Sequence, residues 1–238
     1  MAQPQTTPVE QSLQKIALFK DLPSDTLERI QQLCSWRRYE EDKPILVFGD
    51  DTSEVFFIAE GAAHVTIYSV DGKEVSFRDL GPGEVFGEYA AIDSIPRSAS
   101  VEALTGGCVV ASMTRRKFRE LLQSEPKVTE ALLKHLVNEL RELTTRVYEF
   151  STLPVNDRIR AEVLRIARHV APKGNVARIV PAPTHAHIAS CVSTHREAVT
   201  RELNRLSKEG IIEQQKQACL LVRDIDRLAA MIHEASGE

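Results

Sequence analysis

The chain has 238 residues, of which 42% are hydrophobic and 27% are charged, with a formal net charge of −4 at pH 7. This length admits one large domain or two smaller ones, with two favoured. No run approaches the roughly 20 apolar residues of a membrane helix, and the N-terminus lacks the basic and apolar regions of a signal peptide, so we expect a cytoplasmic protein with no membrane partner.

Residues 1–10 are polar and include two prolines, a composition that predicts disorder. Two short helical patterns follow, at about residues 9–18 and 24–33. We expect Ser24 to be the N-cap of the second helix, because it follows Pro23 directly.

From residue 36 to about residue 113 the sequence changes to short β-branched and aromatic runs that are separated by turn signals. Runs spaced this evenly predict an antiparallel sandwich or barrel of the jelly-roll type. Asp71 and Gly72 separate two of these runs, and this pair is the strongest short hairpin signal in the chain.

A short helix is predicted near residues 115–122, and Pro126 is expected to open a long helix that continues to about Phe150. The apolar residues of the long helix repeat at spacings of three and four, namely Leu133, Leu136, Leu140, Leu143, Val147 and Phe150. This heptad seam predicts a parallel homodimer. The alternative is a helix that packs on its own domain, since the seam spans only roughly two and a half heptads.

Leu153 and Pro154 break the helical pattern and mark a domain boundary, with Asn156 or Asp157 expected to cap the next helix. Beyond the boundary we predict a helix to about residue 170, a strand at 177–180, two helices between 184 and 209, a hairpin over 211–222 and a last helix from residue 224. Helices followed by a small hairpin indicate a winged helix-turn-helix.

Charge is distributed unevenly about this boundary. The part before Pro154 holds 17 basic against 24 acidic residues, and the part from Pro154 onward holds 13 against 10. The second part therefore has the positive balance that suits a phosphate backbone.

The loop from Gly81 to Val101 carries the sharpest chemical signal in the chain. It combines a turn, a carboxylate, a small residue, a guanidinium and a hydroxyl, at Phe86, Gly87, Glu88, Ala90, Arg97 and Ser98. A bidentate donor at Arg97 and an acceptor at Glu88 suit a phosphate beside a ribose. The alternative is an ordinary ion pair between Glu88 and Arg97 in a loop that caps the strands.

Residues 183–212 have the pattern of a helix-turn-helix, with Ile188 and Ala189 on the first helix and Val192-Ser193 at the turn. The buried stripe of the second helix is expected at Val199, Leu203 and Leu206. Polar residues remain on its outer N-terminal face, namely His195, Arg196, Glu197, Thr200 and Arg201. Arginine pairs with guanine and glutamate accepts from the cytosine amino group, so this face can read G·C pairs. The alternative is a charged face that is merely solvated.

The string Phe-Gly-Glu-x-Ala from Phe86, followed by Pro-Arg-Ser-Ala from Pro96, resembles the phosphate-binding cassette of cyclic nucleotide-binding domains. The β-rich region before it and the long helix after it follow that family's order of elements. The resemblance implies that Glu88 binds the ribose 2′-hydroxyl, that Arg97 and Ser98 bind the cyclic phosphate, and that backbone amides near Gly87 and Ala90 complete the site.

The resemblance also implies that the base is read mainly from the long helix. In bacterial cyclic-AMP receptor proteins an adjacent threonine–serine pair contacts adenine, the second residue from across the dimer, and an ungapped match places Leu143 and Thr144 there. Since half of that pair is retained, both cAMP and cGMP stay open as ligands. Ser98 favours cAMP, because the family associates a threonine at this position with cGMP.

Arg196, Glu197, Val199 and Arg201 form an Arg-Glu-x-Val-x-Arg string that resembles the recognition helix of the cyclic-AMP receptor protein family. The implied target is duplex DNA carrying a palindrome of TGTGA-like half-sites, one for each subunit, and RNA polymerase is an implied partner. His185 stands where the family carries a phosphate-contacting arginine before the first helix. The resemblance covers about residues 10–225.

The expected fold class is α+β, with a jelly-roll nucleotide-binding domain at 10–125, a dimerisation helix and hinge at 126–153, and a winged helix-turn-helix domain at 154–238. Nucleotide bound beside the long helix would rotate the DNA-binding domains about Pro154. We therefore expect an allosteric transcription activator and not an enzyme.

Two alternatives stay open for the signal and the chemistry. Some relatives sense oxygen, carbon monoxide or nitric oxide through a cluster or haem, although this chain lacks an N-terminal cysteine cluster and keeps Arg97. The other alternative is an enzyme with a metal site made by His185, His187 and Cys191. Two histidines at i and i+2 do not share a helix face, which disfavours that site.

The four cysteines, Cys34, Cys108, Cys191 and Cys219, are scattered without a Cys-x-x-Cys pair. This spacing disfavours a disulfide framework, an iron–sulfur cluster and a zinc site. We expect reduced, mostly buried thiols and no bound metal.

Overall fold

A computed structural model describes residues 12–68, 74–170, 172–216 and 218–236. The chain divides into two compact units, Met1–Glu139 and Leu140–Glu238. The division falls within one continuous helix, α4 (Pro126–Thr152), so each unit is described by itself. The three-part division at 126 and 154 that the sequence suggests stays a prediction.

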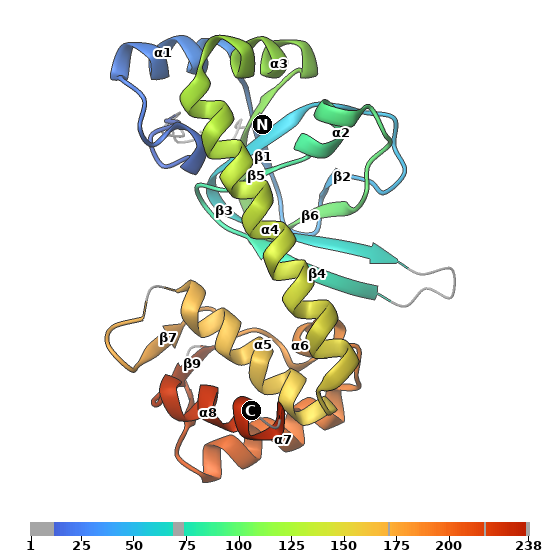
Figure 1. The fold of residues 1–238 in the computed structure, drawn as a ribbon, viewed down its shortest axis with the longest axis vertical. Coiled ribbons are helices and arrows are strands. Elements are labelled where there is room, and N and C mark those ends of the chain that lie inside the picture. The colour runs from blue at the N-terminus through green and yellow to red at the C-terminus, as the bar shows by residue number, and fades with distance from the viewer. Residues whose placement is uncertain (1–11, 69–73, 171, 217, 237–238) are drawn as a thin grey trace, which may run out of the picture. The chain divides into compact units, whose positions relative to one another are not determined.

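The first unit is built on a six-stranded antiparallel sheet, coloured from blue to green in Figure 1. Its strands are β1 (Ser35–Tyr39), β2 (Pro44–Leu46), β3 (Val55–Tyr68), β4 (Glu74–Leu80), β5 (Val85–Phe86) and β6 (Ser100–Met113). The order is β1-β6-β3-β4, with β2 pairing with β6 and β5 pairing with β3. This confirms the predicted β-rich region.

The two long strands approach each other closely at a pair of glycines. Gly61 of β3 and Gly107 of β6 both have positive φ, +76° and +72°. A β-carbon on Gly61 would lie 2.1 Å from the Gly107 carbonyl oxygen, so no larger residue fits there. Register shifts on either side of this point bend β3 within the sheet.

Helices α1 (Ser24–Leu33), α2 (Glu88–Asp93) and α3 (Arg115–Ser124), a 3-10 turn η1 (Ala17–Phe19) and the start of α4 complete the first unit. The predicted helix at 9–18 is wrong for its described part, which is helical only from Ala17 onward. There Leu13 and Ile16 bury their side chains from turns, against the same core as Phe57 and Phe118. The apolar spacing of this segment therefore reflects burial in the core and not a helix.

The structure confirms the predicted helix at 24–33 and corrects its N-cap, whereas two other predictions for this unit concern residues that it does not describe. Helix α1 covers the predicted residues, but Pro23 is its N-cap and Ser24 is already helical, without a side-chain cap. Strands β3 and β4 pair with Tyr68 opposite Glu74. The predicted turn at Asp71-Gly72 and the predicted disorder of 1–10 both lie outside the described residues.

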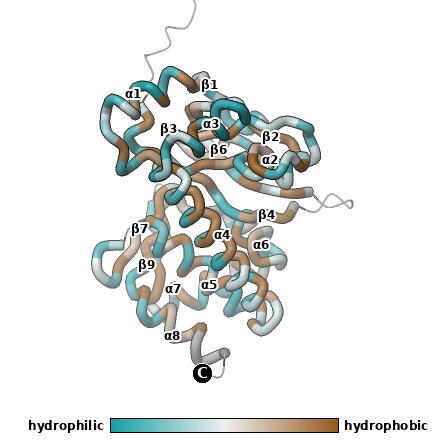
Figure 2. The backbone as a smooth tube through the Cα atoms, turned by 45° about the horizontal axis from the view of Figure 1, so that its top comes forward, coloured by the Kyte–Doolittle hydropathy of each residue, from teal (hydrophilic) through white to brown (hydrophobic). Residues whose placement is uncertain are grey.

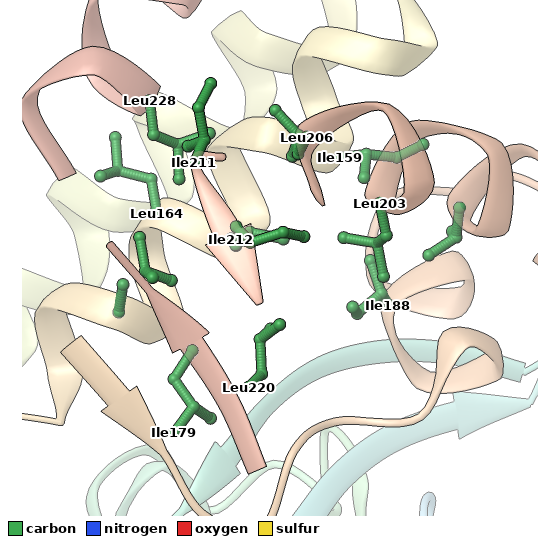
Figure 3. Close-up of a cluster of buried hydrophobic side chains, with 14 of the residues drawn as sticks. Ile159, Leu164, Ile179, Ile188, Leu203, Leu206, Ile211, Ile212, Leu220 and Leu228 are labelled. Carbon is green, nitrogen blue, oxygen red and sulfur yellow. The ribbon is translucent and has the colours of Figure 1, made fainter. Parts of the chain in front are cut away.

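The second unit continues from the end of α4 with α5 (Val155–His169), β7 (Ala177–Ile179), α6 (His185–Cys191), α7 (Arg196–Lys208), β8 (Ile212–Gln215), β9 (Cys219–Val222) and α8 (Ile225–Ser236). The three strands form an antiparallel sheet in the order β7-β9-β8. Figure 3 shows the core, in which Ile188, Leu203 and Leu220 meet between α6, α7 and β9. The arrangement confirms the predicted winged helix-turn-helix.

The prediction that Asn156 or Asp157 caps α5 is wrong. Its N-cap is Pro154, which offers no side-chain hydrogen bond. Asp157 instead lies in the first turn and accepts a hydrogen bond of 2.5 Å from Arg160.

All four cysteines are free, as predicted. Cys108, Cys191 and Cys219 are buried, and Cys34 is partly buried. Burial raises the pKa of the Cys34 thiol to about 12 and that of the Cys108 thiol to about 11. Among the described residues no helix is long and apolar enough to cross a membrane.

Candidate functional site

The loop between β5 and α2 forms the first candidate site. Phe86 ends β5 and stacks on Phe56 of β3 with ring centroids 5.1 Å apart. Gly87 follows in the left-handed region, with φ +77°, and is the N-cap of α2. This conformation turns the chain sharply and leaves the first amides of α2 without helical partners, as an anion site requires.

Arg97 lies against this turn and is almost fully buried, with 3% of its surface exposed. Its guanidinium donates to Thr52 Oγ1 at 2.8 Å, to the Gly87 carbonyl at 2.8 Å and to the Glu54 carbonyl at 2.9 Å. Arginine has five N–H donors, so two remain for another acceptor. Burial lowers the pKa of Arg97, while the Glu54 carboxylate, 3.6 Å away, favours the charged form.

The backbone of Arg97 is also fixed. Its amide donates to the Asp50 carbonyl at 3.0 Å, and its carbonyl accepts from Gly49 at 2.9 Å. Ser98, next in the chain, is exposed and Ala90 is buried. The rigid guanidinium and the exposed hydroxyl therefore stand on consecutive residues.

Glu88 is the first residue of α2 and is 3% exposed. The ion pair with Arg97 that we had considered does not form. Its nearest charged neighbour is His135 of α4, with Oε1 and Nε2 3.8 Å apart. Within the described residues no hydrogen bond reaches the Glu88 carboxylate, so a buried acceptor is left open there.

His135 belongs to a charged cluster that the sequence analysis missed, formed by Arg78, Glu88, Tyr89, His135 and Glu139. Glu139 lies 3.6 Å from His135 Nε2, accepts a hydrogen bond of 2.6 Å from the Tyr89 hydroxyl and pairs with Arg78. Burial and the neighbouring Glu139 raise the pKa of Tyr89. The i, i+4 spacing of His135 and Glu139 was a signal for one shared face.

Glu88, His135 and Glu139 bring three ligand atoms within 4.8 Å of one another, a spacing that could hold a metal ion. Arg78 already supplies the positive charge beside Glu139, and we assign no metal to the cluster. The alternative metal site of His185, His187 and Cys191 does not assemble. His187 lies 3.7 Å from Cys191, whereas His185 contacts Thr200 and Gln214.

Leu143 and Thr144, expected to read the base, fall in the second unit beyond Leu140. Both side chains are exposed, and the Thr144 hydroxyl donates to the Leu140 carbonyl at 2.8 Å. Their role stays a prediction.

The second candidate site is the outer face of α7. Thr184 caps α6 by accepting a hydrogen bond of 3.0 Å from the His187 amide, and Ser193 turns the chain with φ +53°. Val199, Leu203 and Leu206 are buried as predicted. The first turns of α7 therefore present a polar face, with His195, Arg196, Glu197 and Arg201 exposed.

The side chains of Thr200 and His185 are held by contacts with each other and with the hairpin. His185 Nδ1 lies 2.8 Å from the Thr200 hydroxyl, and His185 Nε2 lies 3.3 Å from Gln214 Nε2 of β8. His185 thus connects the recognition helix to the hairpin. The sequence analysis did not single out Gln214.

Comparisons with known proteins match both parts of the chain that carry the candidate sites. The family model of the cyclic nucleotide-binding domain matches residues 36–125, and that of the Crp-like helix-turn-helix domain matches residues 157–231. The cAMP-activated global transcriptional regulator Vfr of Pseudomonas aeruginosa is 29% identical over 194 residues, 78% of this chain and 88% of Vfr. The cyclic AMP receptor protein of Thermus thermophilus is 28% identical over 196 residues, 82% of this chain and 87% of its own.

Solved structures share the fold. A mutant of CooA from Carboxydothermus hydrogenoformans has a TM-score of 0.76 at 18% identity and covers 94% of this chain and 97% of its own. FixK2 from Bradyrhizobium japonicum has a TM-score of 0.72 at 20% identity and covers 83% of this chain and 96% of its own.

Proposed function

Because the chain belongs to the CRP/FNR family of DNA-binding transcription regulators with a cyclic nucleotide-binding domain, we propose that it is a homodimeric transcription activator that responds to cAMP and also accepts cGMP. Bound nucleotide would act through α4 and raise the affinity of the helix-turn-helix for DNA. The proposed DNA site is a palindrome of TGTGA-like half-sites, read in the cytoplasm together with RNA polymerase.

The observation that carries the nucleotide proposal is the pair of open groups around the α2 turn. Arg97 is held rigid with two donors unused, and the buried Glu88 carboxylate lacks a hydrogen bond. Arg97 and Ser98 would bind the cyclic phosphate, Glu88 the ribose 2′-hydroxyl, and the amides near Gly87 and Ala90 would complete the site beside Phe86. Leu143 and Thr144 would contact the base.

Calorimetric titration of the full chain with cAMP and, separately, cGMP tests this proposal. We expect binding that Arg97→Ala abolishes, since the variant removes the phosphate donors. Arg37→Ala, which removes an exposed arginine of β1, should bind as the parent does. A folded parent chain that binds neither nucleotide would contradict the proposal.

The same titration with cyclic di-GMP tests whether this chain binds that nucleotide in place of cAMP. A regulator named c-di-GMP responsive, CLP of Xanthomonas campestris, has a TM-score of 0.69 to this chain at 20% identity. An absorbance spectrum of the purified protein covers the further alternative of a haem or cluster signal. Binding of cyclic di-GMP alone, or an absorbing cofactor, would replace cAMP as the proposed signal.

Direct reading of DNA by the exposed face of α7 is tested by fluorescence anisotropy on a palindrome of TGTGA half-sites. Removing a bidentate arginine contact in Arg196→Ala should cost about 1–3 kcal/mol of binding free energy. Arg205→Ala serves as the control, because Arg205 lies on the same helix but pairs with Glu209 at 2.9 Å. Equal losses in both variants would indicate general electrostatic attraction and not base reading.

A further inference from the structure

His135 lies between the two carboxylates of the charged cluster. Its Nε2 atom is 3.8 Å from Glu88 and 3.6 Å from Glu139, and it is shielded from solvent without a hydrogen-bond partner among the described residues. A small rotation would bring either carboxylate into hydrogen-bond reach. The histidine therefore stands directly beside the open Glu88 acceptor.

Charged groups face this position from every element around it. Glu88 comes from α2, Glu139 from α4 itself and Arg78 from β4, where Arg78 also donates to Glu84 at 3.3 Å. The Tyr89 hydroxyl, from α2, donates to Glu139. With neutral His135 the cluster holds two carboxylates and one guanidinium, so a proton on His135 reduces an excess of negative charge.

We propose that His135 is a positioning residue for the nucleotide, and that its protonated form holds Glu88 in place for the ribose and lets the site accept an anion. The inference rests on the proposed function, because it concerns the regulation of that same site. Cyclic nucleotide affinity is then linked to the uptake of a proton by His135. The substitutions that test this linkage leave the loop from Gly81 to Val101 unchanged.

The direction of this linkage follows from the charges. Burial alone would lower the pKa of His135, but the nearby Glu88 and Glu139 carboxylates raise it overall in the free protein. A bound nucleotide brings another negative charge beside His135, which raises the pKa of His135 further. Affinity is therefore highest below the pKa of the free protein, falls as pH rises from that value to the pKa of the complex, and is constant above it.

Calorimetric titration of the full chain with cAMP at a series of pH values measures the linkage. If the pKa of His135 differs by one unit between the free and bound protein, cAMP affinity falls about tenfold from a pH well below the pKa of the free protein to a pH well above that of the complex. Titrations in two buffers of different ionisation enthalpy count the proton. We expect uptake of a fraction of a proton per cAMP, largest where His135 titrates.

Two substitutions separate charge from shape. His135→Gln removes the titrating group, so its affinity should be independent of pH and as weak as that of the parent chain at high pH. His135→Lys fixes the positive charge and should keep the stronger, low-pH affinity at every pH. His169→Gln changes an exposed histidine of α5 and should leave the parent profile unchanged.

The outcomes distinguish this inference from the function on which it rests. Absence of Arg97-dependent binding at every pH would refute the proposed function. Binding that depends on Arg97, yet shows the same pH profile in the parent chain and in His135→Gln, would refute the role of His135 alone. A pH effect that a chelator abolishes and Zn²⁺ restores would make the cluster a metal site and also overturn the inference.

Discussion

Gly87 occupies a crowded point in the turn between β5 and α2. A β-carbon there would lie 2.8 Å from Arg97 Nη1 and 3.0 Å from the Glu54 carbonyl oxygen, in a backbone conformation with φ +77°. Both neighbours belong to the hydrogen-bond set that fixes Arg97. The glycine is therefore required by contact as well as by conformation.

Gly87→Ala is expected to weaken cAMP binding and to destabilise the fold by more than the about 1–2 kcal/mol of left-handed strain alone. The matched control is Gly174→Ala, which has φ +61° and no atom within 4 Å of the added carbon. Urea unfolding measures the difference in stability, and calorimetry measures affinity. Equal losses of stability in both variants would mean that the contact with Arg97 adds nothing.

Individual site residues were predictable from sequence only where they are close together in the chain. Gly87, Glu88 and Arg97 lie within one loop, and their spacing indicated a phosphate site. Arg78 and His135 come from elements before and after that loop. No local pattern says which face of β4 or α4 they occupy, because packing of the whole unit decides it.

Helices α5 and α7 are joined by a buried ion triad. Arg160 donates to Glu202 at 2.6 Å and to Asp157 at 2.5 Å, and all three residues are buried. A charge removed from such a group leaves buried partners without compensation. The triad therefore fixes the recognition helix on the body of its domain.

Arg160→Met should cost about 3–5 kcal/mol of unfolding free energy, because it leaves the buried carboxylates of Asp157 and Glu202 without their positive partner. Arg205→Met removes an exposed i, i+4 pair and should cost under about 1 kcal/mol. Urea unfolding of both variants measures these costs. Similar values for the two variants would show that the buried triad is worth no more than a surface pair.

The apolar seam of α4 is exposed over most of its length. Leu133, Leu140 and Val147 are 58%, 63% and 66% exposed, whereas Leu136 packs against the core of the first unit. In Figure 2 the tube of α4 alternates between brown and teal, as expected for apolar and charged residues in turn. Such a face supports the proposed homodimer.

Leu140→Glu is expected to convert the dimer to a monomer at micromolar protein concentration, because it places a charge within the seam. Arg141→Glu, an exposed neighbour outside the seam, should leave the dimer intact. Sedimentation equilibrium distinguishes the two states. A parent chain that is already monomeric would remove the homodimer from the proposal.

Elements with a strong period were predictable, and their ends were not. The heptads of α4 and the stripe of α7 are long enough to dominate their surroundings. The segment around Leu13 and Ile16 has helical spacing, but it is short and its residues reach the core from turns. The start of α5 depends on the φ restriction of Pro154 and not on a capping side chain.

At the scale of the whole molecule, α4 is the element shared by the two units. The division at Glu139 and Leu140 cuts it, so its first half belongs to the nucleotide-binding unit and its second half to the DNA-binding unit. Ion pairs from Arg146 to Glu162 and from Arg165 to Glu149 attach the second half to α5. A change in α4 caused by nucleotide binding would therefore act directly on the DNA-binding unit.

Scanning calorimetry tests that coupling. At a concentration one hundred times its dissociation constant, cAMP should stabilise the nucleotide-binding unit by about 2.7 kcal/mol. If α4 couples the units, the unfolding transition of the second unit also shifts, and Arg97→Ala abolishes both shifts. A shift confined to the first unit would mean that the nucleotide signal stops before the DNA-binding domain.

The state of the four thiols makes such coupling accessible to optical measurement. Maleimide dyes react with thiolates, and here three cysteines are buried while the fourth, Cys34, has a pKa of about 12. We therefore expect the native thiols to react slowly with maleimides at neutral pH. Exposed positions such as Glu120 and Lys208 can each be changed to cysteine and carry a fluorophore pair, so that energy transfer reports domain movement in an otherwise unaltered chain.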